Sequence, residues 1–88
     1  MDGEFIELLM DVTLTENIAC QLESGSFSLT LGDYSITKGA YSVSLKPGVS
    51  VLTDKQTDVF SAAQSGYTVV ETAISDGDYN YRYSVVAN

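Results

Sequence analysis

The sequence predicts a mainly β fold: a small antiparallel β-sandwich or barrel-like meander of about seven to eight short strands. Two observations support this fold class. Apolar and polar residues alternate along most of the 88 residues, which is typical of half-buried strands. Turn-forming residues interrupt the alternation about every 9–10 residues, and no repeat with its own signature is evident. A chain of this length provides one core, so we expect residues 1–88 to form a single β-rich domain.

The composition is globular and strongly acidic. Hydrophobic residues make up 44% and charged residues 18% of the chain, and twelve Asp and Glu against four Lys and Arg give a formal net charge of −8. Such a chain repels phosphate backbones, so we expect no nucleic-acid partner. The charge favours solubility and also suits a basic protein partner.

Catalytic side chains are scarce. Cys20 is the only cysteine and there is no histidine, so the sequence offers no disulfide, no thiolate zinc site and no base to activate the thiol. Cys20 shares parity with Ile18 and Leu22, which predicts a core position. We therefore expect no enzyme activity and no cofactor. The acidic N-terminus, with its short apolar run, resembles neither a secretory signal nor a membrane span, and we expect a cytoplasmic or virion location.

The first hairpin is predicted between residues 10–14 and 18–22. A three-residue loop would place Leu14 opposite Ile18 and bring the apolar residues onto one face. The residues before Met10 fit either a helical turn or a strand, and the β-branched residues that follow favour a strand or arm.

The second hairpin is predicted around Gly32 and Asp33. The apolar parity changes across this dipeptide, so a two-residue loop places Leu31 opposite Tyr34 and keeps the flanking apolar residues on one face. Glycine at the first loop position is typical of a type II′ turn.

A third pair of strands is predicted at residues 41–45 and 49–51. The connection Lys46-Pro47-Gly48 fits a three-residue hairpin loop by parity. A residue before proline avoids the α region, however, so an arch between two sheets is the alternative.

One short helix is predicted near residues 54–64. Thr53 or Asp54 could cap its N-terminus, and Gly66 stands where a helix would end. The apolar residues that cluster at helical spacing are Val59, Phe60, Ala62 and Ala63.

The sequence of the C-terminal segment predicts a long hairpin. Asp76-Gly77 is among the strongest two-residue turn signals. The resulting register places Glu71 opposite Arg82, the only arginine, as a cross-strand ion pair. The other face would pair Ile74 with Tyr79, Thr72 with Tyr81, and Val70 with Tyr83.

The same stretch contains a weak metal candidate. Asp76, Asp78 and Asn80 match the first ligands of an EF-hand loop. Tyr81 stands where that loop needs glycine, and Ala87 where it needs a bidentate glutamate. We therefore expect a hairpin rather than a calcium site.

Tyrosines on this hairpin predict contact with another chain. Sugar, peptide and protein ligands all fit an aromatic face, and protein fits best because tyrosine is enriched at interfaces. Parity alone leaves open whether the rings fill the core. The candidate interface residues are Tyr67, Tyr79, Tyr81, Tyr83 and Val86.

These observations predict a non-catalytic structural, assembly or protein-interaction subunit that self-associates through its C-terminal hairpin. Its Ser/Thr/Tyr-rich composition resembles in style that of small virion components such as phage decoration, head–tail or tail proteins, without a shared motif. The alternative is an acidic inhibitor that mimics nucleic-acid charge and blocks a basic surface. The carboxylates that could line up for this role are Asp54, Asp58, Glu71, Asp76 and Asp78, with Asp2, Glu4, Glu7 and Asp11 as a second group.

Overall fold

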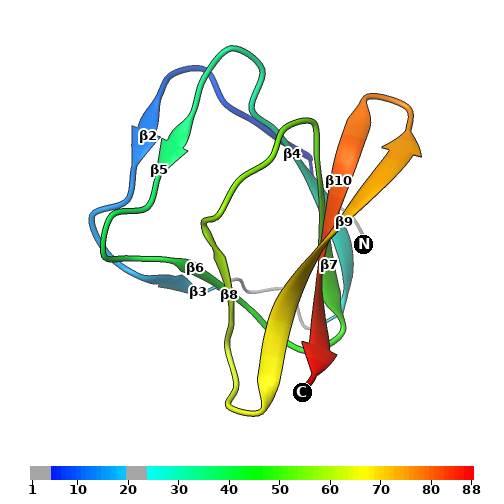
Figure 1. The fold of residues 1–88 in the computed structure, drawn as a ribbon. Coiled ribbons are helices and arrows are strands. Elements are labelled where there is room, and N and C mark those ends of the chain that lie inside the picture. Colours follow the sequence, from blue (N-terminus) through cyan, green and yellow to red (C-terminus); the bar gives the residue numbers. More distant parts are fainter. Residues whose placement is uncertain (1–4, 20–23) are drawn as a thin grey trace.

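The computed structural model describes residues 5–19 and 24–88, which are mainly β (Figure 1). These residues contain ten strands and no helix. The strands are β1 (Phe5–Glu7), β2 (Val12–Thr13), β3 (Ile18–Ala19), β4 (Gly25–Thr30), β5 (Ile36–Thr37), β6 (Val43–Leu45), β7 (Val49–Thr53), β8 (Phe60–Ala62), β9 (Tyr67–Asp76) and β10 (Tyr79–Ala87).

The first eight strands follow a repeated path through three sheets (Figure 1). β1, β2 and β3 form a first coil, β4, β5 and β6 form a second, and β7 and β8 belong to a third. All pairs between coils are parallel: Val12 pairs with Ile36, and Phe27 with Val51. The architecture is therefore a short parallel β-helix, in which each coil stacks on the next.

An antiparallel hairpin closes the third coil. β10 pairs with β7 and with β9, which completes a five-stranded sheet of order β1-β4-β7-β10-β9. The turn uses Gly77 at φ 62°, and no described non-glycine residue has a positive φ. Glycine first in a two-residue loop fits a type II′ turn.

The core lies between the five-stranded sheet and the other two sheets. Inward-facing side chains of successive strands meet in rows, as where Phe27, Val51 and Tyr83 lie side by side. The buried cluster consists of Leu29, Leu31, Leu45, Val49, Val51 and Tyr83. The alternation thus predicted the inward faces of these strands correctly.

Short polar side chains fasten the corners between coils. Asp11 Oδ1 accepts a hydrogen bond from the Ser35 N–H at 3.0 Å, and Asn17 Oδ1 accepts one from the Ser42 N–H at 3.1 Å. Each bond joins the first coil to the second, and its acceptor and donor lie 24 or 25 positions apart in the sequence. These carboxylate and carboxamide oxygens satisfy backbone donors immediately before β5 and β6 begin.

The predicted antiparallel pairing of the first strands is wrong. β4 and β5 lie in different sheets, as do β2 and β3, so neither of the first two hairpins forms. A turn does occur at Gly32, where the Tyr34 N–H donates to the Leu31 carbonyl at 3.0 Å, but it makes a corner of a coil. The Lys46-Pro47-Gly48 connection is the arch between two sheets, joining β6 to β7. The predicted positions of Cys20 and Leu22 lie outside the described residues.

The predicted helix near residues 54–64 is also wrong. Residues 54–59 have no regular structure, and the following residues form β8. The Val43 N–H donates to the Val59 carbonyl at 2.7 Å, so this segment hydrogen-bonds to a neighbouring strand. Val59 is fully buried, and Phe60 contacts the Tyr83 ring with a centroid distance of 5.4 Å. These tertiary contacts override the local helical spacing.

Candidate functional site

A pocket of about 430 Å³ opens between the second and third coils, and we call it the third-coil pocket. Its lining combines apolar side chains, a tyrosine and charged groups from three parts of the chain. The lining residues are Leu31, Tyr34, Ser35 and Ile36 from the second coil, residues 55–58 from the third, and Glu71 from β9.

The pocket exists because the third coil is short. Ile18 pairs with Val43, 25 positions later, whereas Val43 pairs with Phe60, only 17 positions later. The chain between β7 and β8 therefore runs inside the path of the earlier coils and forms no strand beside β5 (Figure 1). The missing strand leaves the side of β5 opposite β2 without a strand partner.

A hydrogen-bond network forms the wall of this pocket on the hairpin side. The Tyr83 hydroxyl donates to Glu71 Oε1 at 2.7 Å and accepts from the Thr57 N–H at 2.8 Å. Gln56 Nε2 donates to Glu71 Oε2 at 2.9 Å. The network fixes residues 56 and 57 of the irregular segment against the hairpin.

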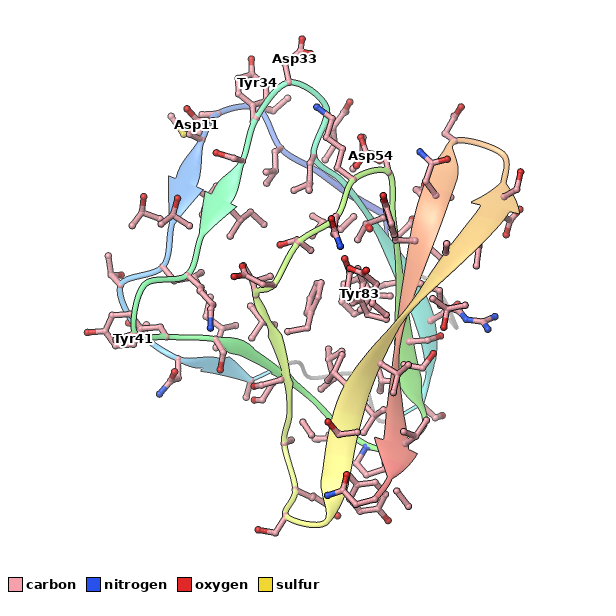
Figure 2. The ribbon with its side chains drawn as sticks, in the orientation of Figure 1. Asp11, Asp33, Tyr34, Tyr41, Asp54 and Tyr83 are labelled. Atoms are coloured by element: carbon pink, nitrogen blue, oxygen red, sulfur yellow. The ribbon has the colours of Figure 1, made fainter. Side chains whose placement is uncertain are left out.

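Tyr83 is the buried centre of this network. Its side chain is 3% exposed and lies near the middle of the molecule (Figure 2). Burial, together with the neighbouring Glu71 carboxylate, raises the pKa of Tyr83 to about 12. The hydroxyl is therefore neutral at ordinary pH, as its role as donor to Glu71 requires.

Asp54 fastens the start of the same segment to the second coil. Its Oδ1 accepts from the Leu31 N–H at 2.7 Å and its Oδ2 from the Gly32 N–H at 2.9 Å. Partial burial raises the pKa of Asp54, but the two backbone donors outweigh it, and the pKa lies below its usual range. Asn80 Nδ2 also donates to the Asp54 carbonyl oxygen at 2.9 Å, so Asp54 is bonded to the β9–β10 hairpin as well as to the second coil. Figure 2 shows Asp54 on the segment that follows β7.

The predicted interface residues divide between core and surface. Tyr83 belongs to the core, Tyr81 packs against it, and Tyr67 and Tyr79 are half-buried. Val86, on the outer face of the five-stranded sheet, is 42% exposed.

The predicted cross-strand ion pair is not formed. Tyr83 pairs with Glu71, and Arg82 with Thr72, one position away from the expected register. Two features cause the shift: the turn uses Gly77-Asp78 instead of Asp76-Gly77, and a bulge follows it. Glu71 is consequently available to the network with Tyr83.

The metal candidate is not assembled into a cluster. Asp76 and Asp78 are exposed at the hairpin turn, and the Asn80 amide is bonded to the Asp54 carbonyl. No group of three or more His, Cys, Asp or Glu side chains suited to hold a metal occurs among residues 5–19 and 24–88.

Sequence reasoning missed most of the pocket. The helical pattern predicts Thr53 or Asp54 as a helix cap and places Lys55 and Gln56 in the helix itself. Their actual positions depend on the length difference between coils, which no local pattern indicates.

Comparison with known proteins does not place this chain in a family. Searches against protein-family models, curated proteins and solved structures find no significant match. In the described part of the chain, no helix has the length and apolar character needed to cross a membrane.

Replacing Tyr83 with phenylalanine tests the network. The Thr57 N–H would lose its acceptor, so we expect the free energy of unfolding to fall by about 1–2 kcal/mol. Urea denaturation measures this change, and Tyr41→Phe, at an exposed tyrosine, is the matched control. Equal stabilities of the two variants would contradict the role assigned to Tyr83.

Alkaline titration tests the same group independently. A folded pKa of about 12 exceeds the usual value of about 10, so the stability linked to Tyr83 is complete below pH 10 and is lost as pH rises through 12. The stability gap between the wild type and Tyr83→Phe should therefore narrow over this range. A gap that stays constant from pH 9 to 12 would argue against the buried, neutral hydroxyl.

Proposed function

We propose that this protein is a non-catalytic structural or assembly subunit that self-associates through the β9–β10 hairpin. The observation that carries this proposal is the exposed edge of the five-stranded sheet. β9 is ten residues long and pairs with β10 alone. Unpaired backbone groups on a long edge strand form a template for pairing with another chain.

β9 lacks two of the features that commonly protect an edge strand. It contains neither lysine nor proline, which natural proteins place on edges to prevent association. On its outer face Val70 is 41% exposed, beside the equally exposed Val86 of β10. This apolar character supports contact with another chain.

The outer face of the hairpin carries little of the molecule's charge and can therefore meet a second copy. Two molecules of net charge −8 repel one another, so they associate best where charges are few. On the outer face of the hairpin beyond the bulge, over residues 67–72 and 82–87, the residues with the parity of Val70 and Arg82 are otherwise uncharged: Thr68, Thr72, Ser84 and Val86. Depletion of charge is also characteristic of the centre of protein interfaces.

A two-fold symmetric pairing of β9 with itself avoids like-charge contact. With Thr72 at the symmetry axis, Glu71 of one copy lies opposite Ala73 of the other. A register centred on Glu71 would place two carboxylates opposite each other, which is destabilising. Of these two registers, the one centred on Thr72 avoids the repulsion, and we take it as the register of the proposed dimer.

Sedimentation analysis of the wild type and two variants tests this proposal. Thr72→Lys places two ammonium groups near the proposed axis and should weaken dimerisation at least about tenfold. Thr15→Lys, at an exposed residue between β2 and β3, makes the same charge change and should leave dimerisation unaltered. A wild type that remains monomeric at millimolar concentration, or a dimer insensitive to Thr72→Lys, would overturn the proposal.

The charge-mimic alternative has less support. Asp11, Asp54 and Glu71 direct their oxygens to groups within the fold, so they are committed to structural hydrogen bonds. A mimic would instead present its carboxylates to a basic partner, with strongly salt-dependent binding. Ser/Thr/Tyr-rich β composition continues to support a place among assembly components such as those of virions.

A further inference from the structure

We propose that the third-coil pocket binds an extended peptide segment carrying lysine or arginine, which pairs with β5 as an added strand. This inference depends on the proposed function in one respect, because both take the partner to be a polypeptide chain. Its site lies beside β5, and Glu71 is the residue that it shares with the β9 edge used for self-association.

β5 presents backbone groups toward the pocket. The Val12 N–H donates to the Ser35 carbonyl and the Leu14 N–H to the Thr37 carbonyl, so the groups on either side of Ile36 face β2. Backbone groups alternate in direction along a strand, and the N–H and C=O of Ile36 therefore point to the side of the third coil. Among the described residues no hydrogen bond joins Ile36 to residues 54–59.

The pocket lies where the next strand of this sheet would stand. The second coil continues the β2 position with β5, but the third coil passes directly from β7 to β8. The space beside Leu31, Tyr34 and Ile36 is bounded by residues 55–58 on its far side. An extended segment placed there would extend the two-stranded sheet to three strands, the binding mode known as strand addition.

The side chains of the pocket fit an alternating peptide. The half-buried Ile36 offers apolar contact to alternate residues of a bound strand, with the buried Leu31 beneath it, and Tyr34, which is 40% exposed, offers an aromatic surface beside them. A strand directs successive side chains to opposite faces, so every second residue of the peptide would meet this apolar wall.

Charge selects a basic peptide. Asp58 and Glu71 both line the pocket, and Lys55 is the one cation among the lining residues of a molecule of net charge −8. Glu71 contributes only its negative charge, because both of its carboxylate oxygens already accept hydrogen bonds from Tyr83 and Gln56. Asp58 is exposed, and no hydrogen bond or ion pair of its side chain occurs among the described residues. A lysine or arginine of the peptide would therefore find an uncommitted carboxylate at the mouth of the pocket.

Selection from a phage-displayed library of random heptapeptides tests this proposal. We expect the wild type to enrich peptides that alternate apolar and polar residues and contain lysine or arginine. Asp58→Lys should reduce the affinity of the protein for a synthetic copy of the most enriched peptide at least about tenfold. Asp78→Lys, in the hairpin turn, makes the same charge change and should leave that affinity unaltered. Asp58→Asn provides a milder variant if charge reversal disturbs the fold.

Amide spectra of the complex locate the bound peptide. We expect shifts at Ile36, Thr37 and residues 55–58, with proton–proton contacts between the peptide backbone and β5. Absence of enriched peptides, binding located elsewhere, or affinity unchanged by Asp58→Lys would overturn the proposal. Repeating the titration with Thr72→Lys distinguishes the two sites, because that variant should lose dimerisation and keep peptide binding.

Discussion

Replacing Leu45 with alanine is expected to lower the free energy of unfolding by about 2–5 kcal/mol. Leu45 is 0% exposed and lies in β6, the central strand of the sheet β3-β6-β8. Its carbonyl accepts a hydrogen bond from the Ala63 N–H at 2.8 Å, which holds the backbone in place around the side chain. Truncation therefore leaves a cavity that the surrounding coils cannot easily fill. Urea denaturation measures the loss.

Two further variants make this result decisive. Leu9→Ala removes the same atoms from a side chain that is 81% exposed and should change stability by less than about 0.5 kcal/mol. Leu45→Met keeps the volume and should cost less than about 1.5 kcal/mol, so it stays measurable if Leu45→Ala does not fold. Similar losses for Leu9→Ala and Leu45→Ala would contradict the position of the core.

Replacing Asp54 with alanine is the second large change, with an expected loss of about 1.5–3 kcal/mol. The carboxylate satisfies two backbone donors of the second coil at once, those of Leu31 and Gly32. Alanine leaves both without an acceptor at the corner where the third coil shortens. The control is Asp76→Ala, which removes the same charge at the exposed end of β9 and should have little effect.

The contribution of Asp54 should depend on pH. Its pKa is lowered in the folded protein, so the stability it supplies is complete above its unfolded pKa, about 3.9, and is lost as pH falls through the lower folded pKa. The stability difference between wild type and Asp54→Ala should therefore shrink on acidification below pH 4. A stability difference that is unchanged between pH 6 and pH 2.5 would show that the ionised Asp54 carboxylate is not what holds the Leu31 and Gly32 amides.

Local sequence patterns predicted the inward-facing residues of β4 and β7 but not which strands are neighbours, and Met10, Ile18 and Tyr34, which the same parity placed on apolar faces, are exposed. The alternation around Leu29 and Leu31 correctly placed both in the core. The same parity is compatible with a hairpin or with a corner of a coil, and only tertiary pairing distinguishes them. The equivalent segments of the first two coils, Val12-Thr13 and Ile36-Thr37, are similar but only two residues long, so the 24-residue spacing is not visible as a repeat.

Prediction of the site was limited in the same way. The hairpin β9–β10 was predicted from a strong turn signal, and its existence is confirmed. A one-residue change of turn and a bulge were enough to exchange Arg82 for Tyr83 as the neighbour of Glu71. The third-coil pocket depends on a length difference between coils, which becomes meaningful only once the coils are known.

Hydrogen exchange measured residue by residue at increasing protein concentration tests the proposed assembly role most directly. If two copies pair through β9, the alternate β9 amides that do not bond to β10 should exchange more slowly as concentration rises, and Thr72→Lys should abolish this change. The Ile36 amide, on the uncovered side of β5, should be unaffected by concentration. Exchange in β9 that is independent of concentration, or protection that grows in the first coil instead, would contradict self-association through the hairpin.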